Sequence, residues 1–165
     1  MARAARAVLT PGKVPGGPAV LRDTHRAMPS ENFEIARRGW EAWDRGDPEE
    51  ATKAFAEDVD WDVSRDIWGD VVGGGHYRGI QGVTDWLRDL NEAWESMEIR
   101  SEEQIEAGEQ VITVMSARGR GRVSGIEVEH HPAGLSTFRE GKIVRVEWFP
   151  TRDEALQAAG RHEQS

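Results

Sequence analysis

The sequence predicts an α+β fold, with helices in its first half and a hairpin-connected sheet in its second half. Apolar residues recur at helical spacing between residues 30 and 94, whereas hydrophobicity alternates with period two between residues 97 and 149. The chain has 165 residues, of which 31% are charged and 38% hydrophobic. This length and composition fit one globular domain with a single core.

The first predicted helix begins after Ser30, whose hydroxyl can cap it, and Gly46 ends it. Its apolar positions are spaced by 3, 4 and 3 residues, which places them on one face of a helix. These positions are Phe33, Ala36, Trp40 and Trp43. We expect this face to enter the core.

A second, short helix follows at once. Asp47 and Glu50 form a capping box around Pro48, and proline is favoured at the first position of a helix. The helix is expected to carry three apolar side chains to the same core, namely Ala51, Ala54 and Phe55. The two helices therefore meet at a tight corner.

The chain then passes through a strand and a loop before a third helix. Residues 58–63 alternate with period two and predict a strand, and the glycine-rich stretch 69–79 predicts a loop. The third helix carries its apolar side chains on one stripe, which we expect to face the core. They are Ile80, Val83, Trp86, Leu87, Leu90, Ala93 and Trp94.

Four strands are predicted in the second half of the chain, each joined to the next by a turn. The strands span residues 97–107, 110–123, 126–138 and 142–149. The turns lie at Gly108-Glu109, Ser124-Gly125 and Glu140-Gly141. Thr151 and Glu154 form a further capping box, so a last short helix is expected to end at Gly160.

Residues 1–27 differ from the rest, because they are rich in Ala, Gly, Pro and Arg and show no lasting apolar period. We expect this segment to be mostly disordered, followed by a single domain over residues 28–160 and a tail over 161–165. The segment holds five basic residues and one acid, which leaves 16 basic against 29 acidic residues in the remainder. One hypothesis is that it is a misassigned upstream start or a dispensable tail.

Composition excludes several classes of function. No run of about 18 apolar residues occurs, and the opening segment lacks the apolar region of a secretory signal, so we expect a cytoplasmic protein without a membrane partner. The absence of cysteine removes disulfides, thiol nucleophiles and cysteine metal sites. A net charge of -9 argues against nucleic-acid binding. The adjacent His130 and His131 point to opposite faces of a strand, so no metal site is expected there.

The hairpin around Ser124-Gly125 predicts two different faces for the sheet. If this turn has two residues, one face carries a charge ladder that pairs Arg122 with Glu127, Arg120 with Glu129, and Arg118 with His131. The other face is built from small residues, namely Ala117, Gly119, Gly121 and Gly134. They leave volume for a cavity on the inner side of a curved sheet. Alternatively, the glycines only bend the sheet or form bulges.

Several motifs within residues 30–158 resemble the nuclear transport factor 2-like superfamily, specifically its SnoaL-like branch. The most specific are Gly46-Asp47, Asp58 to Trp61, Tyr77-Arg78-Gly79 with Gly82-Val83, and Phe138 to Val144. The resemblance implies a cone-shaped fold whose strongly bent, mostly antiparallel sheet wraps around the N-terminal helices and leaves a pocket at its wide end. Such proteins include steroid isomerases, polyketide cyclases, epoxide hydrolases and dehydratases, as well as members with no assigned activity.

The catalytic residues of ketosteroid isomerases have no counterpart at the matching positions. The resemblance places the oxyanion tyrosine on Gly39, the general base on Val63 and the protonated oxyanion acid on Gly134, which disfavours that mechanism. Polyketide cyclases of this branch use an aspartate and a histidine in the pocket. The candidates here are Asp62, one residue from the base position, and His130, which has inward parity. The plainer explanations are a surface carboxylate and a core histidine.

Seven tryptophans against one tyrosine favour a pocket for a flat apolar ligand, although core filling explains most of them. The predicted pocket residues are Trp43, Phe55, Trp61, Trp86, Met115, His130 and Trp148. We expect a small apolar molecule as partner, no cofactor, and a homodimer through the outer sheet face, where Glu147 would lie beside Arg145. The alternatives are a cofactor-free cyclase, isomerase or dehydratase using His130 and Asp62, and a protein-interaction module that uses the outer sheet face.

Overall fold

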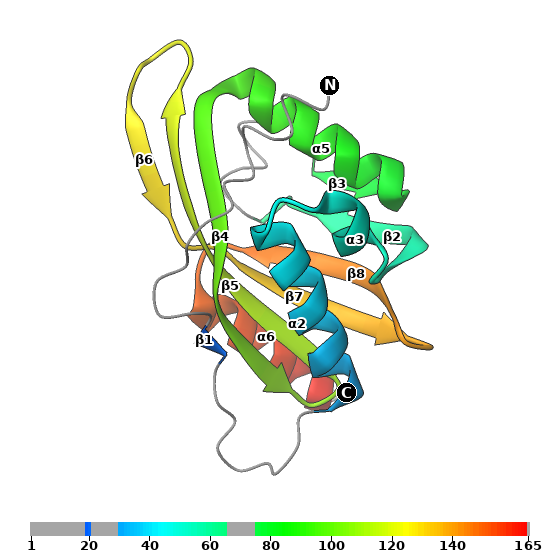
Figure 1. The fold of residues 1–165 in the computed structure, drawn as a ribbon. Helices are drawn as coiled ribbons and strands as arrows, with labels where there is room; N and C mark the ends of the chain where they lie inside the picture. Colours follow the sequence, from blue (N-terminus) through cyan, green and yellow to red (C-terminus); the bar gives the residue numbers. More distant parts are fainter. Residues whose placement is uncertain (1–18, 21–29, 66–74, 165) are drawn as a thin grey trace.

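The computed structural model describes residues 19–20, 30–65 and 75–164, and the predicted α+β fold is confirmed (Figure 1). The helices are α2 (Glu31–Asp44), α3 (Pro48–Thr52), α5 (Gly79–Ala93) and α6 (Arg152–Gln164). The strands are β1 (Ala19–Val20), β2 (Phe55–Asp62), β3 (His76–Arg78), β4 (Trp94–Ala107), β5 (Gln110–Gly121), β6 (Glu127–His130), β7 (Ala133–Arg139) and β8 (Lys142–Phe149).

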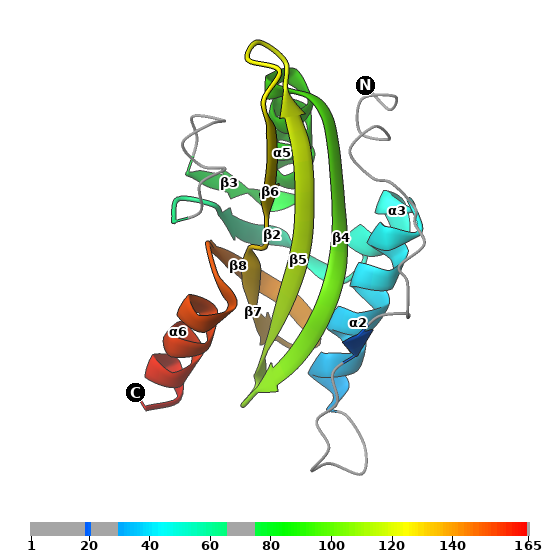
Figure 2. The ribbon, with the colours of Figure 1, turned by 90° about the vertical axis from the view of Figure 1, so that its left-hand side faces the viewer.

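The strands form one bent sheet in the order β1-β4-β5-β7-β8-β2-β3, with β6 paired to β5. All pairs are antiparallel except β1 with β4 and β2 with β8. Figure 2 shows α2 and α3 on one side of the sheet, which we call the inner side, and α6 on the other, the outer side. Within the described ranges, no helix is long and apolar enough to span a membrane.

The predicted helix starts are confirmed by their caps. The Ser30 hydroxyl accepts a hydrogen bond from the amide of Phe33 at 3.1 Å, and the Asp47 carboxylate accepts one from the amide of Glu50 at the same distance. The first helix ends where Gly46 adopts a positive φ of 80°, a conformation that glycine enters without a steric penalty. Local chemistry therefore fixes the corner between α2 and α3.

The end of the second helix was predicted wrongly. The helix stops at Thr52, and Phe55 is the first residue of β2 rather than a helical residue. The amide of Ile143 donates to the carbonyl of Ala54 at 2.8 Å, so pairing with β8 draws this segment into the sheet. Phe55 nevertheless reaches the predicted core.

The hairpin register also differs from the prediction. Arg120 pairs with Glu127 and Arg118 with Glu129, a shift of two residues that leaves every side chain on its predicted face. The turn is wider than two residues, because the amide of Gly121 donates to the carbonyl of Ile126 at 3.0 Å.

Arg122 is released from the predicted charge ladder by this wider turn. Its guanidinium instead donates to three carbonyls at the end of α5, those of Asn91, Glu92 and Trp94. A cation is favourable there because the C-terminal end of a helix carries partial negative charge. Arg122 thereby ties the hairpin to α5.

Other boundaries changed for local reasons. The predicted strand 126–138 is split at His131-Pro132 into β6 and β7, because proline lacks an amide to continue the ladder. Within the predicted loop 69–79, His76–Arg78 forms β3, and residues 69–74 lie outside the described residues. The last helix continues past Gly160 to Gln164, and Ala19–Val20 of the N-terminal segment pairs with β4.

The sheet has a core on each side. The inner core lies between the sheet and the helices α2, α3 and α5, and it contains most of the tryptophans. The outer core is smaller and consists of aliphatic residues and Phe149 beneath an alanine-rich face of α6. Its buried members are Ile112, Val114, Ala133, Leu135, Phe149, Ala155, Ala158 and Ala159.

Candidate functional site

An apolar cavity lies on the inner face of the sheet, between α5 and the strands β4, β5 and β8. It is lined by Trp86, Leu90, Met97, Ile99, Met115, Ala117, Pro132 and Trp148. The hollow contains about 320 Å³ of space free of protein atoms, including the part open to solvent, and about 20 Å³ of it admits the centre of a water-sized sphere. A single water needs about 10–15 Å³ by that measure, so the cavity has room for about one.

Secondary-structure periodicity positions this lining. Trp86 and Leu90 are four residues apart on α5 and therefore lie on one helix face. Met115 and Ala117 are two residues apart on β5, which places both on the inner face of the sheet. The side chains at these four positions are all apolar. Rigid elements on two sides thus present a continuous apolar surface.

The small residues expected to leave a cavity are mostly covered by large side chains. A Cβ added to Gly134 would lie 3.0 Å from two ring atoms of Trp148, and one added to Gly119 would lie 2.9 Å from the terminal methyl of Met97. Gly134 therefore lets the indole of Trp148 pack directly on β7. Only the space beside Ala117 remains open.

The predicted pocket residues lie in four different places. Trp86, Met115 and Trp148 line the cavity, and Trp61 packs behind them, with its ring centroid 5.2 Å from that of Trp86 and 5.6 Å from that of Trp148. His130 lies opposite Ala117 in the β5–β6 register, so the two share the inner face.

Trp43 and Phe55 belong to a different place. They line a second, smaller cavity between α2, α3 and the sheet. About 10 Å³ of it admits the centre of a water-sized sphere. Three pairs of rings link the two regions, because Trp40 lies 5.7 Å from Trp43 and 5.9 Å from Trp148 between centroids, and Phe55 lies 5.8 Å from Trp61. The aromatic residues thus form one continuous cluster with two small voids.

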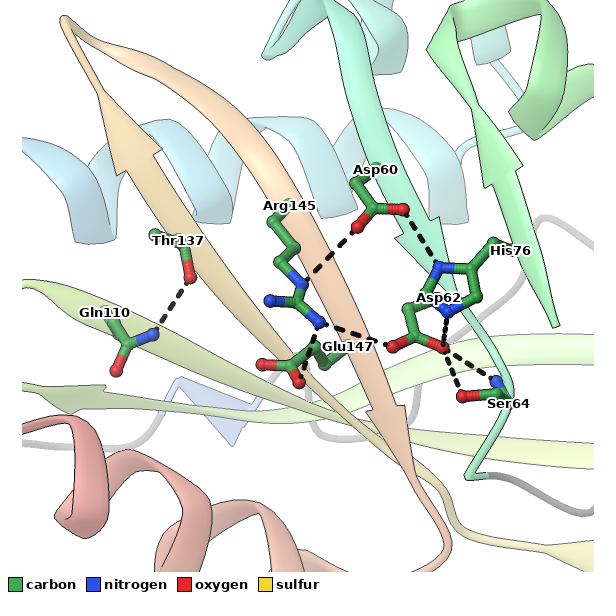
Figure 3. Close-up of polar contacts among 8 residues, drawn as sticks. All are labelled: Asp60, Asp62, Ser64, His76, Gln110, Thr137, Arg145 and Glu147. Atoms are coloured by element: carbon green, nitrogen blue, oxygen red, sulfur yellow. Dashed lines mark hydrogen bonds and ion pairs between the residues drawn. The ribbon is translucent and has the colours of Figure 1, made fainter.

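Asp62 lies on the opposite, outer face of the sheet (Figure 3). There the Arg145 guanidinium contacts three carboxylates, at 3.6 Å from Asp60, 3.4 Å from Asp62 and 3.3 Å from Glu147. The predicted position of Glu147 beside Arg145 is thereby confirmed, although Glu147 is buried rather than exposed to solvent. The structure does not bring Asp62 and His130 together.

The ionisation of Asp62 follows from this setting. Burial alone would raise the pKa of its carboxyl, whereas hydrogen bonds from the Ser64 hydroxyl and amide, at 2.6 and 2.9 Å, lower it. His76 and Arg145 add favourable electrostatics, so the pKa of Asp62 lies below its ordinary value. Asp62 is held as an anion in a structural ion network, away from the cavity.

The lining of the inner cavity limits its chemistry. None of the eight side chains that line it is titratable or nucleophilic. Across residues 19–20, 30–65 and 75–164, no group of three or more His, Cys, Asp or Glu side chains is placed to hold a metal ion. The site can exclude water and contact an apolar molecule through aromatic faces and thioethers.

Sequence reasoning missed five of the lining residues, namely Leu90, Met97, Ile99, Ala117 and Pro132. Leu90 is on the predicted core stripe of the third helix, and Ala117 is among the small inner-face residues predicted to leave volume for a cavity, although neither is among the predicted pocket residues. Met97 and Ile99 belong to β4, whose inner-facing side chains could have been found by extending the same alternation. Pro132 could have been placed at the cavity only by recognising the break between β6 and β7.

Comparison with known proteins gives a family and a fold. The model of the SnoaL-like domain family matches residues 36–146. None of the curated proteins compared with this chain matches it.

Solved structures are similar over most of their length. One is a nuclear transport factor 2-like protein of unknown function from Burkholderia pseudomallei K96243, with 25% identity, a TM-score of 0.62, and coverage of 78% of this chain and 97% of that one. TerC co-crystallized with polyporic acid has 21% identity, a TM-score of 0.62, and coverage of 79% and 99%. A protein from Catenulispora acidiphila DSM 44928 with a ketosteroid isomerase-like fold, in complex with trimethylamine, has 17% identity, a TM-score of 0.55, and coverage of 77% and 92%.

Proposed function

Because this chain belongs to the SnoaL-like domain family, we propose that it binds a small, flat, largely apolar molecule in the inner-face cavity. The observation that carries the proposal is the cavity itself. It lies between α5 and the inner face of the sheet and is lined only by apolar side chains, two of them indoles. Two proteins of the same fold hold small molecules, polyporic acid in TerC and trimethylamine in the protein from Catenulispora acidiphila.

Binding requires the cavity to open. Only about 20 Å³ of it admits the centre of a water-sized sphere, which is room for about one water and too little for an aromatic ring system. Met97 and Met115 form part of its wall, and methionine side chains are unbranched and adapt readily to new shapes. We propose that these two thioethers move aside while the tryptophans keep their places, because each indole is held by neighbouring rings.

The test measures binding of indane, naphthalene and fluorene to the full chain by calorimetry. Ala117→Leu fills the remaining space, so it should abolish binding, whereas Met115→Ala enlarges the cavity and should strengthen binding of the larger probes. Val114→Ile adds one methylene on the outer face of the same strand and serves as the matched control. Binding that survives Ala117→Leu in a folded variant, or its absence from both the wild type and Met115→Ala, would refute the proposal.

A turnover function is the second candidate, and one observation favours it. His130 is the cross-strand partner of Ala117, which lines the cavity, although His130 itself is not among the lining residues. The carboxylate partner would have to differ from Asp62, which is engaged on the outer face. Once a ligand is known, His130→Ala should leave its affinity largely intact and abolish product formation. If turnover persists in His130→Ala, this candidate fails.

We also propose a homodimer through the outer sheet face. The ion network around Arg145 lies on this face, beside the part that α6 covers (Figure 3). Light scattering after size-exclusion chromatography should give twice the monomer mass, and Arg145→Glu should return the protein to monomers. A monomeric mass at high protein concentration would contradict this proposal.

A further inference from the structure

Five buried indoles have an N–H group without an acceptor. They belong to Trp40, Trp43, Trp61, Trp86 and Trp148, and in the part of the chain that the structure describes no oxygen, nitrogen or sulfur accepts a hydrogen bond from any of them. A buried indole N–H usually finds a partner, because its desolvation is otherwise uncompensated. A group of five such donors in one core is therefore unusual and requires an explanation.

These donors are not scattered. The five rings form one chain of contacts, from Trp43 through Trp40 and Trp148 to Trp61 and Trp86, with centroid separations of 5.2 to 5.9 Å. Only two of the five rings, Trp86 and Trp148, also line the inner-face cavity. A molecule entering the cavity can therefore meet these two rings and not the other three.

The cavity lacks the opposite chemistry. Its eight lining side chains include no carboxylate, amide, hydroxyl or imidazole, and the two thioether sulfurs are weak acceptors. It also contains no charged side chain to pair with an ion, and burying an unpaired charge is strongly unfavourable. Two of the rings that line this cavity thus carry a buried N–H without an acceptor, and none of the lining side chains accepts a hydrogen bond strongly.

From this asymmetry we infer that the ligand is an uncharged flat ring system bearing a hydrogen-bond acceptor such as a carbonyl oxygen, which receives the N–H of Trp86 or Trp148. The inference rests on the proposed binding function and adds the ligand's polarity to its shape. A hydrocarbon of the same shape leaves both donors unsatisfied and binds more weakly. An ammonium or carboxylate derivative is rejected because the site holds no counter-charge.

Three probes of one shape test this inference. Indane has no polar atom, 1-indanone adds one carbonyl oxygen, and 1-aminoindane adds an ammonium group at the same carbon. Calorimetry with the full chain should show 1-indanone binding about tenfold more tightly than indane, and 1-aminoindane binding more weakly than both. Equal affinities for indane and 1-indanone would overturn the inference and leave the proposed binding function intact. If no probe binds, the proposed function itself fails.

Matched substitutions identify the donor. Trp86→Phe and Trp148→Phe keep an aromatic ring and remove the N–H, so at least one of them should reduce 1-indanone affinity to that of indane while indane is bound nearly as before. Trp43→Phe removes an equally unpaired N–H that does not line the cavity, and it should change neither affinity. A preference for 1-indanone that survives both Trp86→Phe and Trp148→Phe would contradict the inference. Should a variant not fold, the comparison of probes on the wild type still decides.

Discussion

The two faces of the sheet have different chemistry, although neighbouring residues of the same strands form them. On β2 and β8 the inner side chains are apolar, as in Trp61 and Trp148, whereas the outer ones form the Arg145 ion network. The inner face leaves hydrogen-bond donors unpaired around a cavity, while the outer face pairs its charges. Successive residues of a strand thus face either an apolar surface suited to a ligand or a surface whose charged groups pair with one another.

This difference explains why a residue's chemistry alone is a poor guide to the site here. Asp62 is an ionised carboxylate in a hollow fold, yet its oxygens are occupied by Ser64, His76 and Arg145. The cavity, by contrast, contains no titratable side chain. The proposed binding surface is recognised by its apolar lining and by indole N–H groups that have no acceptor.

The largest expected effect comes from the centre of the inner face. Trp61 is fully buried and contacts the rings of Phe55, Trp86 and Trp148. Trp61→Ala should lower the free energy of unfolding by about 3–5 kcal/mol, because it removes aromatic contacts and leaves a cavity. Urea denaturation measures this, with Trp61→Phe as the milder control. A loss below about 1 kcal/mol would mean that the inner core is not close-packed.

The next effect breaks the outer face. Arg145→Met removes the cation that contacts Asp60, Asp62 and Glu147, and we expect a loss of about 2 kcal/mol at neutral pH, reduced from the fully buried case because the guanidinium is partly exposed. The loss should shrink as the pH falls through the lowered pKa of Asp62, since protonation of that carboxylate removes part of the need for a cation. Arg118→Met, in an exposed pair with Glu129, is the control and should change stability by less than about 0.5 kcal/mol.

The pH dependence of the wild type follows from the same network. The pKa of Asp62 is lower in the folded protein than in the unfolded chain, so its contribution to stability is present above the unfolded value and is lost as the pH falls through the folded value. A plot of unfolding free energy against pH should therefore decline on the acid side, and Asp62→Asn should flatten part of that decline. An unchanged slope in Asp62→Asn would remove Asp62 from the network's energetics.

A smaller effect tests the contact of Trp148 with β7. Gly134→Ala places a Cβ against a rigid indole ring, and we expect a loss of about 1–2 kcal/mol. Gly160→Ala is the matched control, because no atom lies within 4 Å of its added Cβ and alanine favours the helix there. Thermal unfolding of the two variants should move in opposite directions. A neutral Gly134→Ala would show that Trp148 can shift freely.

The smallest effect concerns the edge of the outer face. Burial lowers the pKa of His131, but Glu102 and Glu129, at 3.0 and 3.2 Å from its two ring nitrogens, raise it overall. Its contribution is therefore present below the ordinary histidine pKa and lost as the pH rises through the folded value. His131→Gln should cost a few tenths of a kcal/mol at pH 5.5 and nothing at pH 8.5. A pH-independent cost would indicate packing instead.

The sequence predicted the fold well where local signals act alone. The caps at Ser30 and Asp47 placed the helices, and alternation placed Trp61 and Asp62 on opposite faces. It failed where distant segments compete, as when β8 recruited Phe55 into β2 and the end of α5 drew Arg122 out of the hairpin ladder.

The candidate site was predictable only in part for a related reason. Small residues on β5 and β7 indicated open volume, but which large side chain fills such volume depends on contacts across the sheet. Trp148 covers Gly134 and Met97 approaches Gly119, so the cavity remains only beside Ala117. Parity gives the face of each residue, and packing decides which part of that face stays open.

The central claim is that a ligand enters the inner-face cavity and meets Trp86 and Trp148. A ¹H–¹⁵N spectrum of the full chain during titration with 1-indanone tests it most directly, because each indole N–H gives its own signal and Trp→Phe variants assign them. We predict that the signals of Trp86 and Trp148 shift with saturation, while that of Trp43 stays in place. Saturable shifts that spare both Trp86 and Trp148, or no shift at any indole, would contradict the claim.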